Sequence, residues 1–252
     1  MKAILICSHG SRDPRDNTMV LGHAEKIAEE TGLTVRTGYM KHQEPTVMDV
    51  LSGLAADGHD EVVIVPMLYA EGRLTERDLP AILGIPEGSR EGAVTTPSGD
   101  VSVRITGAFG DHPSMTAVME AAVSGHPADT TTVVLVGHGS KGPGNSRTVE
   151  YDADILRAMG YTVVCAYNEM QDPTVEAALE TALSSGRPRV LVIPMFVSPN
   201  GHSRVDIPGK LGIGDSTGRV FDTPDGPVEL LYGAEIGTHP GVGRILLERA
   251  SE

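Results

Sequence analysis

Three shortages in the sequence each exclude a class of protein. Cysteine occurs only twice in 252 residues. Cys7 and Cys165 both lie in apolar stretches, so we expect buried thiols in a cytoplasmic protein and no disulfide framework. No apolar run approaches the roughly 18 residues that a membrane-spanning helix needs, so no membrane partner is expected. The apolar stretch at residues 3–7 is too short for a signal peptide and is predicted to be a strand.

Basic residues are also scarce. Lys and Arg total 20 against 34 Asp and Glu, which gives a formal net charge of −14. No run is rich in Lys or Arg, so a nucleic-acid partner is not expected. Because an acidic surface repels acidic ligands at long range, an anionic ligand must be held by local Arg, Lys or backbone N–H groups.

Two well-known functional loops are missing as well. Residues 137–142 read Gly-His-Gly-Ser-Lys-Gly. The segment is not a G-x-S-x-G nucleophile elbow, because His138 stands where a glycine is required. It is not a phosphate-binding P-loop either, because no Gly-Lys-Ser/Thr follows at the required distance. Its backbone N–H groups, just before a predicted helix, are still suited to hold a carboxylate or a phosphate.

What the chain does have is a regular alternation of strand-like and helix-like segments. Such alternation predicts right-handed βαβ units around a mainly parallel sheet flanked by helices, and therefore an α/β fold. In the first half, strands are predicted at residues 2–7, 34–39, 61–65 and 101–106, and helices at residues 16–31, 45–56 and 113–123, with a short helical region around residues 78–80.

The pattern then repeats over the second half. His138 in His-Gly-Ser-Lys matches His9 in His-Gly-Ser-Arg, and Pro173 in Gln-Asp-Pro-Thr-Val matches an earlier Gln-Glu-Pro-Thr-Val. The offset between matching positions stays between 127 and 129 residues along the chain. A separation this constant indicates two copies of one domain, which we predict at residues 1–125 and 131–252.

The two copies differ where they would carry chemistry. His138, Glu169 and His202 all follow predicted strands of the second copy. The carboxyl ends of parallel strands meet at one edge of a sheet, and ligands bind there. In the first copy Lys41 replaces Glu169 and Leu74 replaces His202. We therefore expect a working site in the second copy and a degenerate site in the first.

Two imidazoles and a carboxylate suit a divalent metal such as cobalt, nickel, zinc or iron(II), and a neutral imidazole also accepts a proton. The spacing is less specific than a compact metal motif, and structural roles stay open: a tight turn for His138 and a solvated loop acid for Glu169. Asp78 and Asp206 recur in both copies and are predicted to cap helix N-termini.

These motifs resemble one known family. His-Gly-Ser-(Arg/Lys) after the first strand, and Pro-Met-Phe followed by Gly-His-x3-Asp-Ile-Pro after the third, are similar to the sirohydrochlorin chelatases of the cobalamin-pathway type, which are class II tetrapyrrole chelatases. The resemblance covers nearly the whole chain in its two-domain form. It implies two flavodoxin-like lobes with a cleft between them. It also implies a lyase that inserts Co²⁺, or alternatively Ni²⁺ or Fe²⁺, into sirohydrochlorin without ATP or another nucleotide.

The resemblance implies roles for individual residues. The two metal-binding histidines correspond to His138 and His202, while Glu169 matches less closely and stands as either a ligand or a proton acceptor. The family substrate carries many carboxylates, and the residues expected to hold it are Gly139, Ser140, Asn200 and Gly201.

One alternative function remains open. A non-catalytic protein would carry a tetrapyrrole or a metal ion in the same interdomain cleft, and the fold class does not separate it from an enzyme. We expect a monomer or a weak homo-oligomer, because an internal duplication can replace a homodimer.

Overall fold

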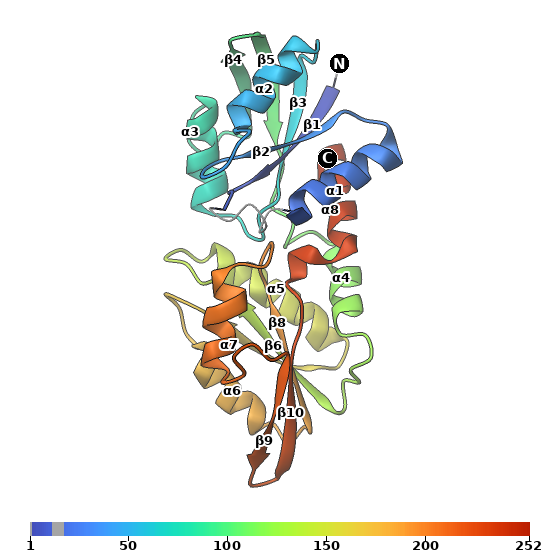
Figure 1. The fold of residues 1–252 in the computed structure, drawn as a ribbon, viewed down its shortest axis with the longest axis vertical. Helices are drawn as coiled ribbons and strands as arrows, with labels where there is room; N and C mark the ends of the chain where they lie inside the picture. Colours follow the sequence, from blue (N-terminus) through green and yellow to red (C-terminus); the bar gives the residue numbers. More distant parts are fainter. Residues whose placement is uncertain (1, 12–17) are drawn as a thin grey trace. The chain divides into compact units, whose positions relative to one another are not determined.

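A computed structural model of the chain describes residues 2–11 and 18–252. The chain divides into two compact units (Figure 1). The first unit consists of Met1–His112 together with Pro240–Glu252, and the second consists of Pro113–His239. The predicted α/β class is confirmed, because each unit contains one mainly parallel sheet flanked by helices.

The first unit has a five-stranded sheet in the order β2-β1-β3-β5-β4, in which β4 runs antiparallel to β5 and the other neighbours are parallel. Its elements are β1 (Lys2–Ser8), α1 (Thr18–Thr31), β2 (Val35–Tyr39), α2 (Val47–Ala56), β3 (Glu61–Pro66), a π-helical turn (Leu74–Asp78), α3 (Leu79–Leu83), β4 (Glu91–Thr96), β5 (Gly99–Ile105) and α8 (Pro240–Ser251). The expected start of the first helix at residue 16 lies outside the described residues.

The second unit repeats this sheet in the order β7-β6-β8-β10-β9, with β9 antiparallel to β10. Its elements are α4 (Met115–Ala122), β6 (Thr131–Gly137), α5 (Gly144–Ala158), β7 (Thr162–Tyr167), α6 (Val175–Leu183), β8 (Arg189–Pro194), a π-helical turn (His202–Asp206), α7 (Ile207–Lys210), β9 (Gly218–Thr223), β10 (Gly226–Tyr232) and a 3-10 turn (Ile236–Thr238).

The strands β1 and β6 are the most deeply buried of the two sheets. Each pairs with a parallel strand on both sides, and Leu5 and Leu135 at their middles have no exposed surface. A strand covered on both faces is apolar without polar alternation. This is the pattern that predicts both strands from the sequence.

The start of α2 differs from the sequence expectation. Thr46 is the N-cap: its hydroxyl accepts the N–H of Asp49 at 3.1 Å, and the Asp49 carboxylate accepts the N–H of Thr46 at 2.9 Å. This reciprocal capping box fixes the first helical residue at Val47. Pro45, the first residue of the helix predicted at residues 45–56, therefore stands just outside the helix. Thr174 caps α6 in the second unit in a similar way.

Sequence patterns do not predict β4 and β9. Each forms a hairpin with the strand that follows it and lies at the edge of its sheet. Most side chains on these edge strands are not buried, so the strands lack the apolar run that marks the central ones. The strand predicted as the fourth, at residues 101–106, is therefore the fifth and spans Gly99–Ile105.

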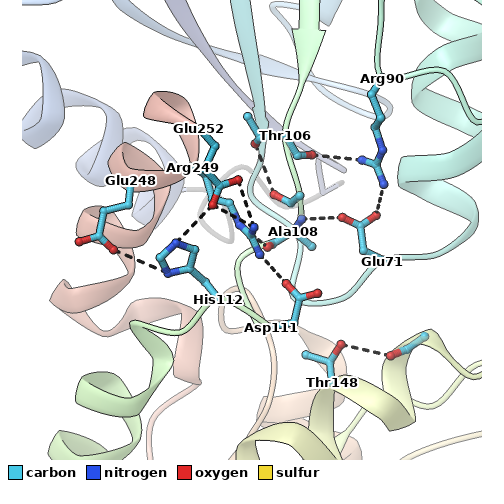
Figure 2. A network of polar contacts seen from close by, with 12 residues as sticks. Glu71, Arg90, Thr106, Ala108, Asp111, His112, Thr148, Glu248, Arg249 and Glu252 are labelled. Carbon is cyan, nitrogen blue, oxygen red and sulfur yellow. Dashed lines mark hydrogen bonds and ion pairs between the residues drawn. The ribbon is translucent and has the colours of Figure 1, made fainter.

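The last helix of each sequence repeat packs in the compact unit built mainly from the other repeat. Helix α8 packs on α1 and β3, while α4 packs on α5. Arg249 of α8 donates to the carbonyl oxygen of Ala108 at 3.1 Å and pairs with the carboxylate of Asp111 (Figure 2). The repeats predicted at residues 1–125 and 131–252 and the compact units are thus two different divisions of the chain.

Both cysteines are free thiols buried in strands, as expected, Cys7 in β1 and Cys165 in β7. Burial raises the pKa of each thiol to about 12. Neither is therefore an appreciable thiolate at neutral pH. In the part of the chain that the structure describes, no helix has both the length and the apolar composition to cross a bilayer.

Candidate metal centre

Three of the predicted site residues meet at the carboxyl ends of β6, β7 and β8. His138 directly follows β6, Glu169 follows β7 after one intervening residue, and His202 opens the π-helical turn after β8. Because these strands are adjacent and parallel, their ends lie at the same edge of the sheet. The topology of the second unit thus brings together residues that are far apart in sequence.

A glycine allows the loops after β6 and β7 to approach closely. Gly139 has a φ of +85°, and a Cβ built there would lie 1.8 Å from the carbonyl oxygen of Glu169. No L side chain fits that space. The N–H of Glu169 donates to the carbonyl oxygen of His138 at 2.9 Å, which fixes the two residues side by side. Gly139 therefore positions the candidate ligands and makes no side-chain contact of its own.

The ring of His138 has one nitrogen committed and the other available. Its Nδ1 lies 2.9 Å from the carbonyl oxygen of Gly139. A carbonyl oxygen only accepts, so Nδ1 carries the proton and Nε2 keeps a lone pair for a metal ion. The His202 ring lies 4.8 Å away between centroids, at an interplanar angle of 89°. The buried ring of Phe196 lies within 6.4 Å of both imidazoles and provides an apolar wall.

The Nδ1 atom of His202 faces two carboxylates. It lies 2.7 Å from Oδ2 of Asp206 and 3.8 Å from Oε1 of Glu169. Among the described residues, Glu169, His202 and Asp206 form a compact group whose ligand-type atoms all lie within 4.8 Å of one another. A proton on Nδ1 donated to Asp206 leaves Nε2 of His202 free, as in His138.

A buried amide and a lysine support His202 from the side. The Asn168 amide nitrogen lies 3.2 Å from His202 Nδ1, and the Asn168 side-chain oxygen accepts from Nζ of Lys210 at 2.9 Å. Lys210 also donates to the backbone carbonyl oxygen of Asn168. Because an ammonium group only donates, it fixes which end of the amide faces the imidazole. The amide nitrogen and the Nδ1–H group are both donors, so the hydrogen bond of His202 Nδ1 goes to Asp206 at 2.7 Å, and Asn168 packs beside the ring.

The expectation that Asp78 and Asp206 cap helices is wrong. Both have right-handed helical backbone angles, and neither side chain makes a capping hydrogen bond. A π-helical turn precedes each of them, so each lies inside a continuous helical segment. Sequence reasoning missed Asp206 as a site residue. The signal was its spacing, because residues four apart on a helix lie on one face and His202 is four residues earlier.

The residues expected to hold substrate carboxylates line the same loops. Asn200 accepts the N–H groups of His202 and Ser203 with its side-chain oxygen, at 2.9 and 3.2 Å, and so orders the start of the π-helical turn. Ser140 donates its hydroxyl to a carbonyl oxygen within its own loop. A Cβ added at Gly201 would meet nothing within 4 Å. Their role toward substrate, like that of Gly139, stays a prediction.

Comparison with known proteins agrees with this architecture. The sequence model of the CbiX family matches residues 3–125 and again residues 132–252. The chain is 30% identical to the probable sirohydrochlorin cobaltochelatase of Halobacterium salinarum, in an alignment covering 100% of this chain and 91% of the relative. It is 31% identical to the sirohydrochlorin cobaltochelatase of Methanopyrus kandleri, over 48% of this chain and 94% of that protein.

Solved structures show the same fold. SirB from Bacillus subtilis with Fe³⁺ superposes with a TM-score of 0.77 at 20% identity, covering 100% of this chain and 94% of that one. The CbiX enzyme of siroheme biosynthesis in denitrifying bacteria superposes with a TM-score of 0.68 at 19% identity, covering 99% and 98%. The doubled sheet, the histidine motifs at its strand ends and the family match over both repeats lead to one conclusion: the chain belongs to the CbiX family.

Proposed function

We propose that the protein inserts a divalent metal ion, Co²⁺ foremost with Ni²⁺ and Fe²⁺ as alternatives, into sirohydrochlorin. The observation that carries this proposal is the pair of perpendicular imidazoles of His138 and His202 beside the carboxylate of Glu169, at the strand ends of a CbiX-family chain. The names of the Halobacterium and Methanopyrus relatives support the same reaction and substrate.

Metal capture is the first task of this site. The Nε2 atoms of His138 and His202 supply the nitrogen ligands, and Glu169 supplies an oxygen ligand. Nitrogen and oxygen donors of this kind suit Co²⁺, Ni²⁺ and Fe²⁺. The side chains of His202 and Glu169 are 35% and 44% exposed, so a hydrated ion reaches them directly. Asp206 and the Gly139 carbonyl hold the imidazoles in the orientation that ligation requires.

Proton removal is the second task, because the pyrrolic nitrogens lose protons as the metal enters the macrocycle. Transfer of the metal to the tetrapyrrole frees Nε2 of both His138 and His202, and each takes one of the two pyrrolic protons. The His202 imidazolium is stabilised by the carboxylate of Asp206 on its Nδ1 side. Each imidazole thus serves as a ligand first and as a base afterwards.

The proposal needs no nucleotide, because the tetrapyrrole is a stronger chelator than two imidazoles and a carboxylate, so transfer runs downhill. Two buried free thiols suit a reducing compartment, so we place the reaction in the cytoplasm. The duplicated chain acts as a monomer or weak oligomer.

A metal-insertion assay tests this function. Purified protein is mixed with Co²⁺ and sirohydrochlorin, and the absorption change is compared with the uncatalysed rate. We expect clear acceleration by the wild type, and a loss of about 100-fold or more in His138→Ala and in His202→Ala, because both metal capture and proton transfer depend on them. His126→Ala is the matched control, since His126 lies in the segment joining α4 to β6.

The same assay separates an enzyme from a carrier. A non-catalytic binding protein would bind Co²⁺ or the tetrapyrrole without raising the insertion rate. Unchanged activity in both histidine variants would overturn the site assignment while leaving the reaction in place.

A further inference from the structure

The first unit holds cations at positions where the second unit holds its candidate metal ligands or their neighbours. Lys41 occupies the position of Glu169, and Arg73 occupies the position of Gly201. Both follow strands of the first unit at the carboxyl ends of β2 and β3. The same strand-end architecture therefore presents positive charge in one copy and a ligand set in the other.

These two cations share one carboxylate. The Nε atom of Arg73 lies 3.2 Å from Oδ1 of Asp78, and Nζ of Lys41 lies 3.5 Å from Oδ2 of the same residue. One negative charge therefore faces two positive charges, and the pair keeps a positive surplus. The side chains of Arg73 and Lys41 are 73% and 45% exposed, so both present donors to solvent. Among the described residues, the terminal nitrogens of Arg73 make no hydrogen bond or ion pair.

A third cation lies on the same π-helical turn, next to the exposed acid Glu76. Arg77 is exposed, lies one residue before Asp78 on the same π-helical turn, and occupies the position of Val205 in the second unit. Within the described part of the chain it has no ion pair. We call Lys41, Arg73 and Arg77 the basic cluster.

The positive charge of these residues shifts the pKa values of two neighbouring groups, His9 and Asp78. His9, the counterpart of His138, has a pKa below its ordinary value because burial and the nearby Lys41 ammonium both disfavour its charged form. Burial acts to raise the pKa of Asp78, but Arg73 and Lys41 outweigh it and hold the pKa below its ordinary value. A cationic imidazole is disfavoured at this edge of the sheet, and a carboxylate is favoured. This environment opposes metal binding and suits an anion.

We propose that the basic cluster is a carboxylate-binding site that receives the acidic side chains of the tetrapyrrole. The inference rests on the proposed function for the identity of the ligand. In a chain with a net charge of −14, a polycarboxylate ligand is repelled at long range and needs local cations to hold it. Arg73 offers two terminal nitrogens in the planar arrangement that matches a carboxylate, and Lys41 adds a point charge.

Binding of a metal-free polycarboxylate porphyrin tests the site directly. Uroporphyrin is titrated into the full-length protein, and the dissociation constant is followed by fluorescence. The test variant is Lys41→Ala/Arg73→Ala. The matched control is Lys26→Ala/Arg36→Ala, which also removes one lysine and one arginine from ion pairs of the first unit, those with Glu30 and Asp57.

We expect the test variant to weaken uroporphyrin binding by about tenfold, the effect of losing two partly exposed charge-assisted contacts. The control should bind like the wild type, and added salt should weaken the wild type more than the test variant.

Three results would overturn the proposal: no binding of uroporphyrin by the wild type, equal binding by the wild type and the test variant, or an equal loss in test and control variants. If the test variant is poorly folded, Lys41→Gln/Arg73→Gln and the charge-preserving Lys41→Arg/Arg73→Lys replace it, and only the latter should retain binding. A wild type that binds uroporphyrin through the basic cluster but inserts no metal would refute the proposed function and leave this site standing.

Discussion

The Nδ1 atom of His202 lies 2.7 Å from Oδ2 of Asp206, one turn further along the same helical segment. This contact explains how a partly exposed imidazole keeps one orientation. A carboxylate that accepts from Nδ1–H selects the tautomer with a free Nε2 and makes that nitrogen a better ligand.

Removing this carboxylate should therefore weaken metal binding. We expect Asp206→Ala to lower Co²⁺ affinity by about 10- to 100-fold, the usual cost of losing the partner of a ligating histidine. Asp206→Asn keeps an acceptor for Nδ1–H without the charge, so its Co²⁺ affinity should lie between those of the wild type and Asp206→Ala. Titration calorimetry measures both. Asp154→Asn, which removes an exposed ion-paired carboxylate of α5, is the control and should bind like the wild type.

Restoring the ligand set in the first unit should create a second metal site. Lys41→Glu/Leu74→His returns the carboxylate and the imidazole of the second copy, while His9 and Asp78 are already present. We expect the double variant to take up a second equivalent of Co²⁺, measured by equilibrium dialysis. Leu74→His alone should not, because the Lys41 ammonium still repels the ion. Unchanged stoichiometry in the double variant would refute the equivalence of the two strand ends.

The loop that carries His138 should tolerate alanine at one glycine and reject it at another. At Gly139 the added methyl group would collide with the Glu169 carbonyl at a positive φ, whereas at Gly142 it would meet nothing within 4 Å. We expect Gly139→Ala to lower the free energy of unfolding by about 2 kcal/mol or more and to impair metal binding, with Gly142→Ala close to the wild type. Urea unfolding and Co²⁺ titration report the two effects separately.

A partly buried carboxylate of the first unit should make stability depend on pH. Glu71 accepts from Arg90 and from the Ala108 N–H, each at 2.7 Å (Figure 2). Burial acts to raise its pKa, but these hydrogen bonds and one from the Thr75 hydroxyl hold the pKa below its ordinary value. The stabilisation is therefore complete above the unfolded-state pKa of about 4.3 and is lost as the pH falls through the folded-state value.

We expect Glu71→Gln to lower the free energy of unfolding at pH 7 by about 1–2 kcal/mol. The difference from the wild type should shrink as the pH falls below about 4. Urea midpoints at several pH values measure this. Glu91→Gln, at an exposed position of β4, should follow the wild type at every pH. A constant difference across the pH range would contradict the role given to the Glu71 charge.

The sequence predicts most of what positions the site. Buried parallel strands appear in the sequence as continuous apolar runs rich in β-branched residues. The near-constant offset between matching positions, such as His9 and His138, reveals the duplication. The sequence therefore predicts the sheets and the edges that carry the candidate ligands. The proximity of His138 and His202 follows from strand order alone. The meeting of Glu169 with His138 depends in addition on the left-handed backbone of Gly139, which a sequence pattern does not show.

Other features depend on context that local patterns do not contain. Edge strands such as β4 are short of apolar side chains because one side of the strand has no partner. Asp206 resembles a cap because it precedes Ile-Pro, yet the π-helical turn before it already satisfies the helix start. The sequence also does not predict which of the two sheets α8 packs on, because an apolar helix face fits either copy of a repeated sheet equally well.

The placement of α8 has a consequence for how such a protein is divided or assembled. His112, at the end of the first unit's main segment, lies 3.6 Å from Glu248 and 3.5 Å from Glu252 of the distant C-terminus (Figure 2). Scission of the chain at residues 125–131 would leave the first sheet without a helix that only the far fragment carries. Two severed halves would have to reassociate by trading helices, as subunits do in domain swapping. The exchange of the last helix between the two repeats is the arrangement of a domain-swapped pair whose subunits are joined in one chain.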